Sequence, residues 1–201
     1  MVAMTVLPEE MPRETLDSVL RRIGDRPFTV EDLAELPDDG LRYEIDEGVL
    51  IVNAAPSDFH QLATGNLIHI LADACPRGFA VMVGPAVVIS PVQVRIPDIV
   101  VVPSKRFNPE YRDIPPVLAV EVASPSTRAY DRTRKLEVYA DFGIADYWIV
   151  GPDPDKPSIT AFALDGKRYR QAGFTAGGET FTAARPFPVS FTPLDLVDTG
   201  A

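Results

Sequence analysis

The chain has 201 residues, a formal net charge of −10 and a sequence pI near 4.6. This length is typical of one domain with short extensions, and the hydrophobic share of 46% supplies enough apolar material for a core. The acidic balance argues against a protein that coats nucleic acid non-specifically, and the single cysteine excludes an internal disulfide. The absence of long apolar runs and of a signal-peptide pattern predicts a cytoplasmic protein with no membrane partner.

The first half of the chain predicts helices around a hairpin. Apolar residues recur at helical spacing between Pro12 and Gly24, and a second, shorter helix is expected between Thr29 and Pro37. Two strand patterns follow at 41–45 and 48–53 and predict a hairpin. A longer helix is expected after them, capped by Ser57 and running to about Ala74.

The second half is rich in strand patterns. Strands are expected at 79–83, 86–90, 98–102, 117–123, 146–150, 159–164 and 168–171, with one helix at 130–142 that ends at Gly143. The sequence from about residue 172 onward predicts no definite element. Apolar runs such as IVVV and VLAVEV indicate a sheet that is covered on both faces. The elements therefore favour an α/β or α+β core.

Two acids interrupt the most apolar of these strands. Asp98 stands at the start of the 98–102 strand, and Glu121 lies inside the 117–123 strand, on the same face as Ala119 and Ala123. A carboxylate in a buried strand is costly unless it is paired, hydrogen-bonded or bound to a cation. The small neighbours leave room for a metal ion with its water ligands, and a salt bridge to Arg42 or Arg95 is the structural alternative.

The helix that follows Glu121 supplies positive charge. Residues 128–135, around its start, contain one acid and four basic residues: Arg128, Arg132, Arg134 and Lys135. Lys135 stands at the edge of the apolar stripe of this helix, from where its ammonium group could reach the end of the Glu121 strand. Two carboxylates from neighbouring strands and a lysine are the residue set of a Mg²⁺- or Mn²⁺-dependent phosphodiesterase.

The sequence resembles the Uma-two family of restriction endonucleases, a branch of the PD-(D/E)XK nuclease superfamily. The segments that carry the resemblance are RYEIDEGVLIV (42–52), PSDFHQ (56–61), IPDIVVV (96–102), LAVEVASPST (118–127) and DRTRKLEVYADFGIADYWIV (131–150). They cover most of the chain, in the order that the family has them. The resemblance implies an α/β restriction-endonuclease-like fold, with a mixed central β-sheet flanked by helices.

The resemblance also implies roles for individual residues. Asp98 and Glu121 match the two metal-binding acids of the superfamily. The superfamily lysine is expected two residues after the second acid, where this chain has Ala123, so the family pattern makes Lys135 the candidate for that role. Glu44 matches the acid that the family has before the first helix, and it either completes the metal site or binds a second ion, or is a surface acid of the hairpin. His60 is either a ligand of phosphate or water near the site or a structural residue of its helix.

The function implied by the resemblance is Mg²⁺-dependent hydrolysis of phosphodiester bonds in nucleic acid, most simply DNA, by a homodimer. The expected domain spans 28–195, after an N-terminal extension (1–27) with a helix and before a short tail (196–201). Two alternatives stay open: a catalytically inactive module with the nuclease fold that binds a metal or a partner, and a hydrolase of small phosphodiesters. The aromatic pair Tyr147 and Trp148 is expected at a sheet edge or subunit contact.

Overall fold

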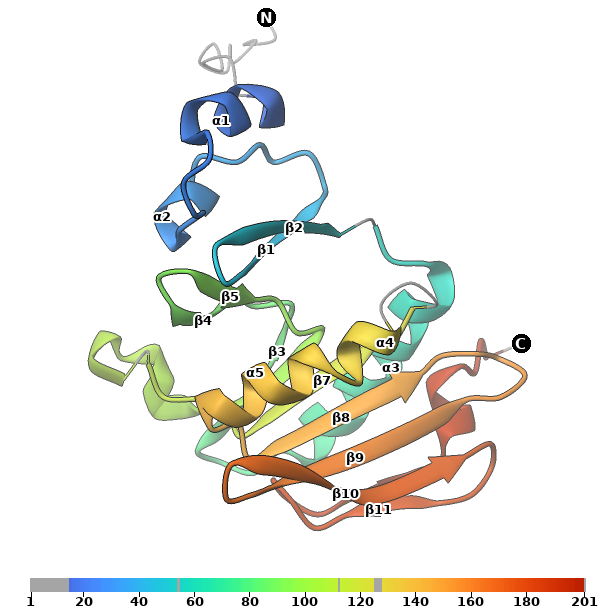
Figure 1. Ribbon diagram of the computed structural model, residues 1–201. Helices are drawn as coiled ribbons and strands as arrows, with labels where there is room; N and C mark the ends of the chain where they lie inside the picture. The colour runs from blue at the N-terminus through green and yellow to red at the C-terminus, as the bar shows by residue number, and fades with distance from the viewer. Residues whose placement is uncertain (1–14, 54, 112, 125–127, 201) are drawn as a thin grey trace, which may run out of the picture.

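The computed structural model describes residues 15–53, 55–111, 113–124 and 128–200. A six-stranded sheet forms the body of the molecule, and a smaller four-stranded sheet with two short helices lies beyond one end of it (Figure 1). Residues 1–14 of the predicted N-terminal extension, and residues 125–127 of the segment between the Glu121 strand and the basic helix, lie outside the described residues. None of the described helices has the length and apolar character needed to cross a membrane.

The large sheet is mixed, as the sequence predicts. Its strands, in spatial order, are β10 (Arg168–Ala176), β9 (Ser158–Asp165), β8 (Asp146–Gly151), β7 (Leu118–Val122), β6 (Ile99–Pro103) and β3 (Phe79–Val83). Only β7 and β8 are parallel among these neighbours, and the crossover between them contains α4 (Arg128–Asp131) and α5 (Arg134–Phe142). Parallel neighbours need such a crossover, because the end of the first strand and the start of the second lie at opposite ends of the sheet.

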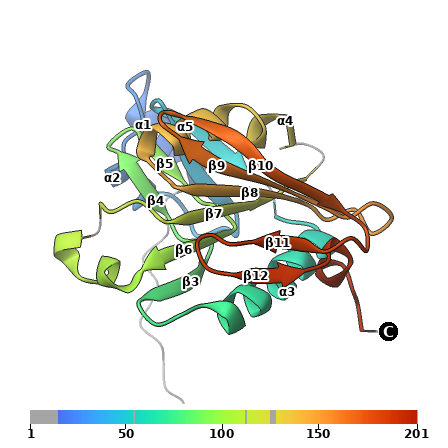
Figure 2. The ribbon, with the colours of Figure 1, turned by 90° about the horizontal axis from the view of Figure 1, so that it is seen from below.

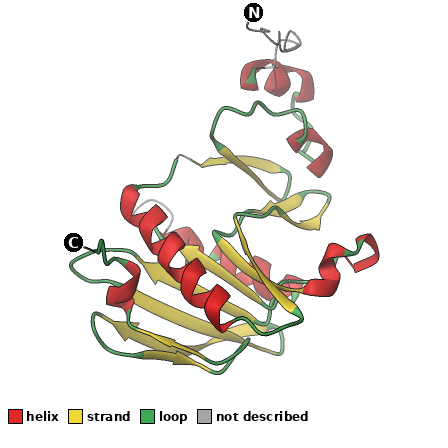
Figure 3. Cartoon of the chain, turned by 180° about the vertical axis from the view of Figure 1, so that it is seen from behind, coloured by secondary structure: helices red, strands yellow, loops and turns green. Residues whose placement is uncertain are grey.

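Both faces of the large sheet are covered, which explains the apolar strand runs. The long helix α3 (Asp58–Ala74), the strand pair β11 (Phe181–Ala183) and β12 (Val189–Phe191), and the 3-10 turn η3 (Pro193–Leu196) pack on one face. Helix α5 packs on the other face, against Ala119, Ala123, Tyr147 and Ile149. The views from below and from behind show α3 on the opposite side of the sheet from α5 (Figures 2 and 3).

The small sheet contains the predicted hairpin. Its spatial order is β2 (Val49–Asn53), β1 (Arg42–Asp46), β5 (Gln93–Arg95) and β4 (Val87–Ser90), with all neighbours antiparallel. Helices α1 (Leu16–Ile23) and α2 (Val30–Leu33) bury an apolar cluster against β1 and β5. Val87 of β4 packs on Val100 and Val102 of β6, so the small sheet is joined to the large one through apolar contacts.

The structure corrects several details of the sequence prediction. The helix expected at 130–142 is two helices, because a turn at residues 132–133 separates α4 from α5. Strand β5 has only three residues and lacks an apolar run, and β10 continues past Gln171 through a register shift. Two further short elements, η1 (Ser104–Phe107) and η2 (Pro109–Tyr111), lie between β6 and β7. Tyr147 and Trp148 are fully buried in the interior strand β8, so their expected position at an edge was wrong.

Candidate functional site

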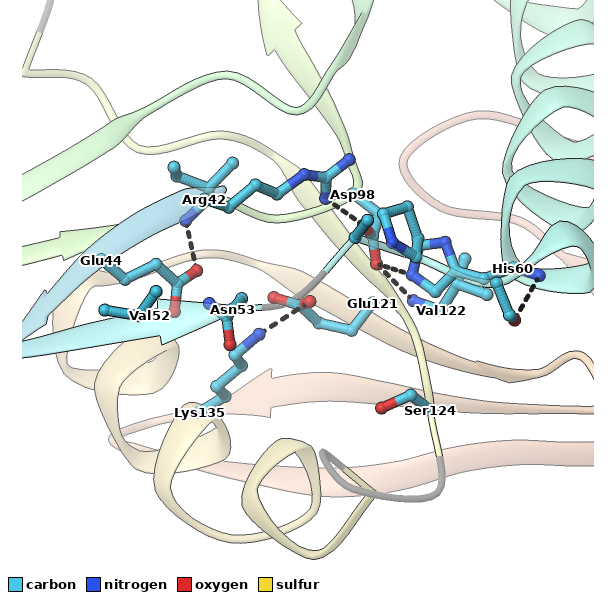
Figure 4. A pocket seen from close by; sticks show the side chains of 14 residues that line it. Arg42, Glu44, Val52, Asn53, His60, Asp98, Glu121, Val122, Ser124 and Lys135 are labelled. Carbon is cyan, nitrogen blue, oxygen red and sulfur yellow. Dashed lines mark hydrogen bonds and ion pairs between the residues drawn. The ribbon is translucent and has the colours of Figure 1, made fainter. Parts of the chain in front are cut away.

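A cavity of about 530 Å³ lies where the two sheets approach each other (Figure 4). Its walls come from the hairpin β1–β2, the loop before α3, the first turn of α3, the adjoining ends of β6 and β7, and α5. The charged and imidazole side chains that line it are Arg42, Glu44, His60, Asp98, Glu121 and Lys135. All five residues that the sequence predicts as a site, Glu44, His60, Asp98, Glu121 and Lys135, therefore face one cavity.

The register of β6 and β7 brings the two central acids together. Ile99 pairs with Val120 in this antiparallel pair, so the next position places Asp98 opposite Glu121. Both acids are buried, with 4% of each residue exposed. The backbone amide of Val122 donates a 2.8 Å hydrogen bond to Asp98 Oδ2, which fixes the Asp98 side chain on the β7 end.

Asp98 receives donors from three different elements. Arg42 in β1 donates through Nη1 to Oδ1 over 2.8 Å, and His60 Nε2 in α3 lies 3.1 Å from Oδ2, which also accepts from the Val122 amide. Burial works to raise the pKa of Asp98, but the His60 ring and the other donors outweigh it and hold that pKa below its ordinary value. Asp98 is thus kept as a carboxylate.

Glu121 is held by two side chains of α5. Lys135 Nζ lies 2.8 Å from Oε2, and the Tyr139 hydroxyl donates to Oε1 over 2.6 Å. Burial raises the pKa of Glu121 to about 8, against the opposing effect of the Lys135 charge and with a further rise from the Asp98 charge. Burial works to lower the pKa of Lys135, but Glu121 and the neighbouring Glu44 and Asp131 raise it, so the ammonium group keeps its proton.

Glu44 and His60 occupy opposite walls of the cavity. Glu44 is 2% exposed, and its Oε1 accepts a 2.7 Å hydrogen bond from the Ile96 amide, so the acid belongs to the buried face of β1. His60 lies in the first turn of α3, where Ser57 caps the helix as predicted. The Nε2 of His60 points at Asp98, and its Nδ1 lies 3.5 Å from the Thr64 hydroxyl.

A group of polar contacts centred on the Asp46 carboxylate holds the cavity wall from outside. Asp46, at the end of β1, accepts from the Tyr130 hydroxyl over 2.7 Å and from Arg134 Nη2 over 3.0 Å. Arg95 Nη2 lies 2.6 Å from the same carboxylate, and Gln93 donates to it over 3.1 Å. Burial works to raise the pKa of Asp46, but these donors keep it low. Asp46 therefore ties the α4–α5 segment, which carries Lys135, to the strand that carries Glu44.

Two residues at the site were not assigned to it from the sequence. From the sequence, Arg42 is expected only as one possible salt-bridge partner, and no role is expected for Tyr139. The spacing of Lys135 and Tyr139, four residues apart on one helix, is the signal for Tyr139, since such residues share a helix face. Asp98 is paired with Arg42, whereas Arg95 pairs with Asp46. The part each side chain plays in a reaction stays a prediction.

Comparison with known proteins places the chain in a family. A search among curated proteins finds no match. The crystal structure described as "a putative nuclease belonging to DUF820 from Anabaena variabilis ATCC 29413" superposes with a TM-score of 0.69 at 16% identity, covering 85% of this chain and 98% of that one. At this identity the likeness shows a shared fold, and it supports the predicted fold class. The sequence model of the Uma2 family, described as "Putative restriction endonuclease", matches residues 30–197. This chain belongs to the Uma2 family.

Proposed function

We propose that this protein is a Mg²⁺- or Mn²⁺-dependent nuclease that hydrolyses phosphodiester bonds in DNA. The observation that carries the proposal is the meeting of Asp98 and Glu121 at neighbouring strand ends, with Lys135 Nζ 2.8 Å from Glu121. Membership in a family described as restriction endonucleases, and a shared fold with a protein described as a nuclease, support the same reaction class. The homodimer implied by the resemblance belongs to the proposal, and light scattering after size-exclusion chromatography tests it.

The residues present fit a hard divalent ion. Among the described residues, no group of three or more His, Cys, Asp or Glu side chains forms a cage for a metal. Mg²⁺ does not require one, because it is commonly held by one or two carboxylates and completes its shell with water and substrate phosphate. An ionised carboxylate has about four acceptor positions. Among the described residues, Asp98 Oδ1 and each oxygen of Glu121 accept one donor apiece, so all three keep capacity for a cation.

The side chains around the cavity suit phosphodiester hydrolysis. A divalent ion held by Asp98 and Glu121 would polarise the phosphate and acidify a water molecule. The Lys135 ammonium keeps its proton and is fixed by Glu121, so it can position the attacking water and stabilise negative charge that develops on the phosphate. Attack in line leaves a 5′-phosphate on one product. His60 on one wall would bind phosphate or water, and Glu44 on the opposite wall would complete the metal site or bind a second ion.

The acidic surface does not contradict a nucleic-acid substrate. Arg42 and Lys135 both line the cavity, and together with a bound divalent ion they would give the site a locally positive charge. Local attraction of this kind acts on the scissile phosphate, whereas non-specific binding depends on many phosphate contacts along a basic surface. We therefore expect weak binding of DNA without a divalent ion and a strong dependence of binding on that ion.

Titration calorimetry with Mn²⁺ and Mg²⁺ tests the metal site. Wild type, Asp98→Asn and Glu121→Gln are compared with Asp165→Asn, which removes a half-exposed carboxylate paired with Arg170 at the far hairpin. We expect millimolar or tighter binding in wild type and Asp165→Asn, and its loss in the two cavity variants while they remain folded. Equal binding by all four proteins would show that Asp98 and Glu121 do not bind the metal.

Cleavage assays separate the proposed nuclease from its two alternatives. Supercoiled plasmid, a single-stranded oligonucleotide and bis(p-nitrophenyl) phosphate are incubated with the wild-type protein and Mn²⁺. Cleavage of DNA that Glu121→Gln abolishes supports the nuclease. Turnover of the small phosphodiester alone favours the small-substrate hydrolase, and metal binding without any turnover favours the inactive module.

A further inference from the structure

Arg42 lies in the cavity wall, and its contact with Asp98 occupies only part of the hydrogen-bond donors of its guanidinium group. The side chain is 33% exposed, and Nη1 donates to Asp98 Oδ1 over 2.8 Å (Figure 4). A guanidinium group has five N–H donors, and the bond to Asp98 uses one of them. Because Arg42 lines the cavity, its other donors are available to a group that enters there.

The acceptor positions of Asp98 determine where a cation would bind. Oδ2 already accepts from the Val122 amide and lies 3.1 Å from His60 Nε2, whereas Oδ1 accepts from Arg42 alone among the described residues. The oxygen of Asp98 with more free acceptor capacity is therefore Oδ1, which Arg42 contacts, and it is the oxygen that would hold a divalent ion. Two cations at one oxygen repel each other, so the metal and the Asp98–Arg42 ion pair compete.

Lys135, the other cation of the cavity, differs from Arg42 in its freedom to move. Lys135 is 6% exposed, and its Nζ lies 2.8 Å from Glu121 and 3.3 Å from Asp131. If its ammonium group moved away, these two buried acids would lose their cationic partner. Arg42 has a single acid partner among the described residues, and its longer, partly exposed side chain can turn into the cavity. Planar guanidinium groups also match the geometry of phosphate, which accepts two parallel N–H donors.

We infer that Arg42 is a phosphate-binding residue that exchanges Asp98 for a phosphate of the nucleic-acid substrate when a divalent ion takes Asp98 Oδ1. This inference rests on the proposed function and adds a residue to it that the sequence did not assign. It makes metal and substrate binding mutually supportive: the metal frees Arg42, and the phosphate compensates the charge that Arg42 then exposes.

Two binding measurements on Arg42→Gln, without turnover, test the inference. Mn²⁺ affinity is measured by calorimetry, and binding of a labelled single strand and a 20-base-pair DNA duplex is measured in Ca²⁺. We expect Arg42→Gln to bind Mn²⁺ at least about threefold more tightly, because a competing cation is removed. We expect it to bind DNA at least about tenfold more weakly, with the slope of log affinity against log salt reduced by about one. Arg170→Gln, which breaks an exposed ion pair with Asp165, is the matched control and should change neither quantity.

The possible results distinguish this inference from the proposed function. Wild-type Mn²⁺ binding that becomes weaker in Arg42→Gln would show that Arg42 only orients Asp98, and would overturn the inference while the metal site stands. Tighter Mn²⁺ binding with unchanged DNA affinity would overturn the phosphate role. No binding of Mn²⁺ by wild type or variant, or no binding of DNA by the metal-loaded wild type, would overturn the proposed function and the inference together.

Discussion

The Tyr139 hydroxyl donates a 2.6 Å hydrogen bond to Glu121 Oε1 from the same helix that carries Lys135. Lys135 lies four residues earlier in α5, so the two side chains share a face and contact the two oxygens of one carboxylate. Glu121 is thus oriented by a neutral donor and by a cation, both on α5 rather than on its own strand. The geometry of the proposed metal ligand depends on how α5 packs.

Tyr139→Phe should destabilise the protein while keeping its fold. Above a pH of about 8, where Glu121 is ionised, the change removes one donor from a buried carboxylate, and a hydrogen bond to a charged group is worth roughly 1.5–3 kcal/mol. Urea unfolding measures the loss. Tyr169→Phe is the control, because its hydroxyl donates to the neutral Ile144 carbonyl over 2.7 Å and its loss should cost only about 1 kcal/mol. A smaller loss for Tyr139→Phe than for Tyr169→Phe would contradict the assigned contact.

Lys135→Met should separate metal binding from hydrolysis. Asp98 and Glu121 keep their oxygens, so Mn²⁺ binding persists, but the rate of DNA hydrolysis should fall by about 100-fold or more because the charge that stabilises the phosphate is lost. The broken buried pair should also cost up to about 3–5 kcal/mol of stability, which the double variant Lys135→Met/Glu121→Leu recovers in part. Unchanged hydrolysis by a folded Lys135→Met protein would exclude the proposed role of this residue.

The raised pKa of Glu121 predicts a particular dependence of stability on pH. The folded protein holds a proton on Glu121 up to a pKa of about 8, whereas the unfolded chain releases it near the ordinary value of 4.5. Between these values the folded state binds more protons, so this group makes stability fall as pH rises from about 5 to about 8. Urea midpoints are measured across this pH range for wild type and Glu121→Gln. The difference between the two curves isolates the contribution of Glu121 to stability. A difference curve that is flat, or that rises with pH, would refute the assignment.

The affinity for a metal ion should also depend on the ionisation of Glu121, but it should rise with pH where the stability falls. A divalent ion binds the ionised carboxylate and displaces the proton, so Mn²⁺ affinity should increase as pH rises toward about 8 and level off above it. Calorimetry in two buffers of different ionisation enthalpy measures the protons released at pH 7. Release of no proton would show that Glu121 is already ionised there or is not a ligand.

Asp46→Asn should destabilise the contact between the small sheet and the α4–α5 segment. The substitution removes the charge that partners Arg95, which is fully buried, and Arg134, so a loss of about 3–5 kcal/mol is expected, as for a broken buried ion pair. Glu47→Gln is the matched control, since Glu47 also contacts Arg134 but its side chain is 76% exposed, and it should cost at most about 1 kcal/mol. Thermal or urea unfolding compares them, and similar losses would mean that Asp46 is not the residue that holds the α4–α5 segment to β1.

The sequence predicts the parts of the fold that depend on local signals. Apolar runs locate β6 and β7 because both faces of these strands are buried, and Ser57 locates the start of α3 because its hydroxyl satisfies a helix amide. Asp98 and Glu121 are visible as acids in strands that otherwise demand apolar residues. These local signals, with the family pattern, are enough to predict five residues that line one cavity.

Other features depend on tertiary contacts and were missed for that reason. Strand β5 is short and polar, and it forms because Gln93 and Arg95 reach Asp46 on the neighbouring strand. The division of the strands into two sheets is likewise set by pairing between distant segments rather than by any local pattern. Arg42 acquires its place at the cavity through a partner 56 positions along the chain, a distance over which residue spacing carries no information.

The buried acids of the cavity have partners within the protein itself. Arg42 and His60 contact Asp98, Lys135 and Tyr139 contact Glu121, and the Ile96 amide donates to Glu44. The fold therefore gives each of these acids partners from the protein itself. Small zinc domains, by contrast, unfold when a chelator removes their metal. This protein should tolerate EDTA during purification, and its divalent ion would be a reagent that can be added, withdrawn or exchanged without rebuilding the polypeptide around it.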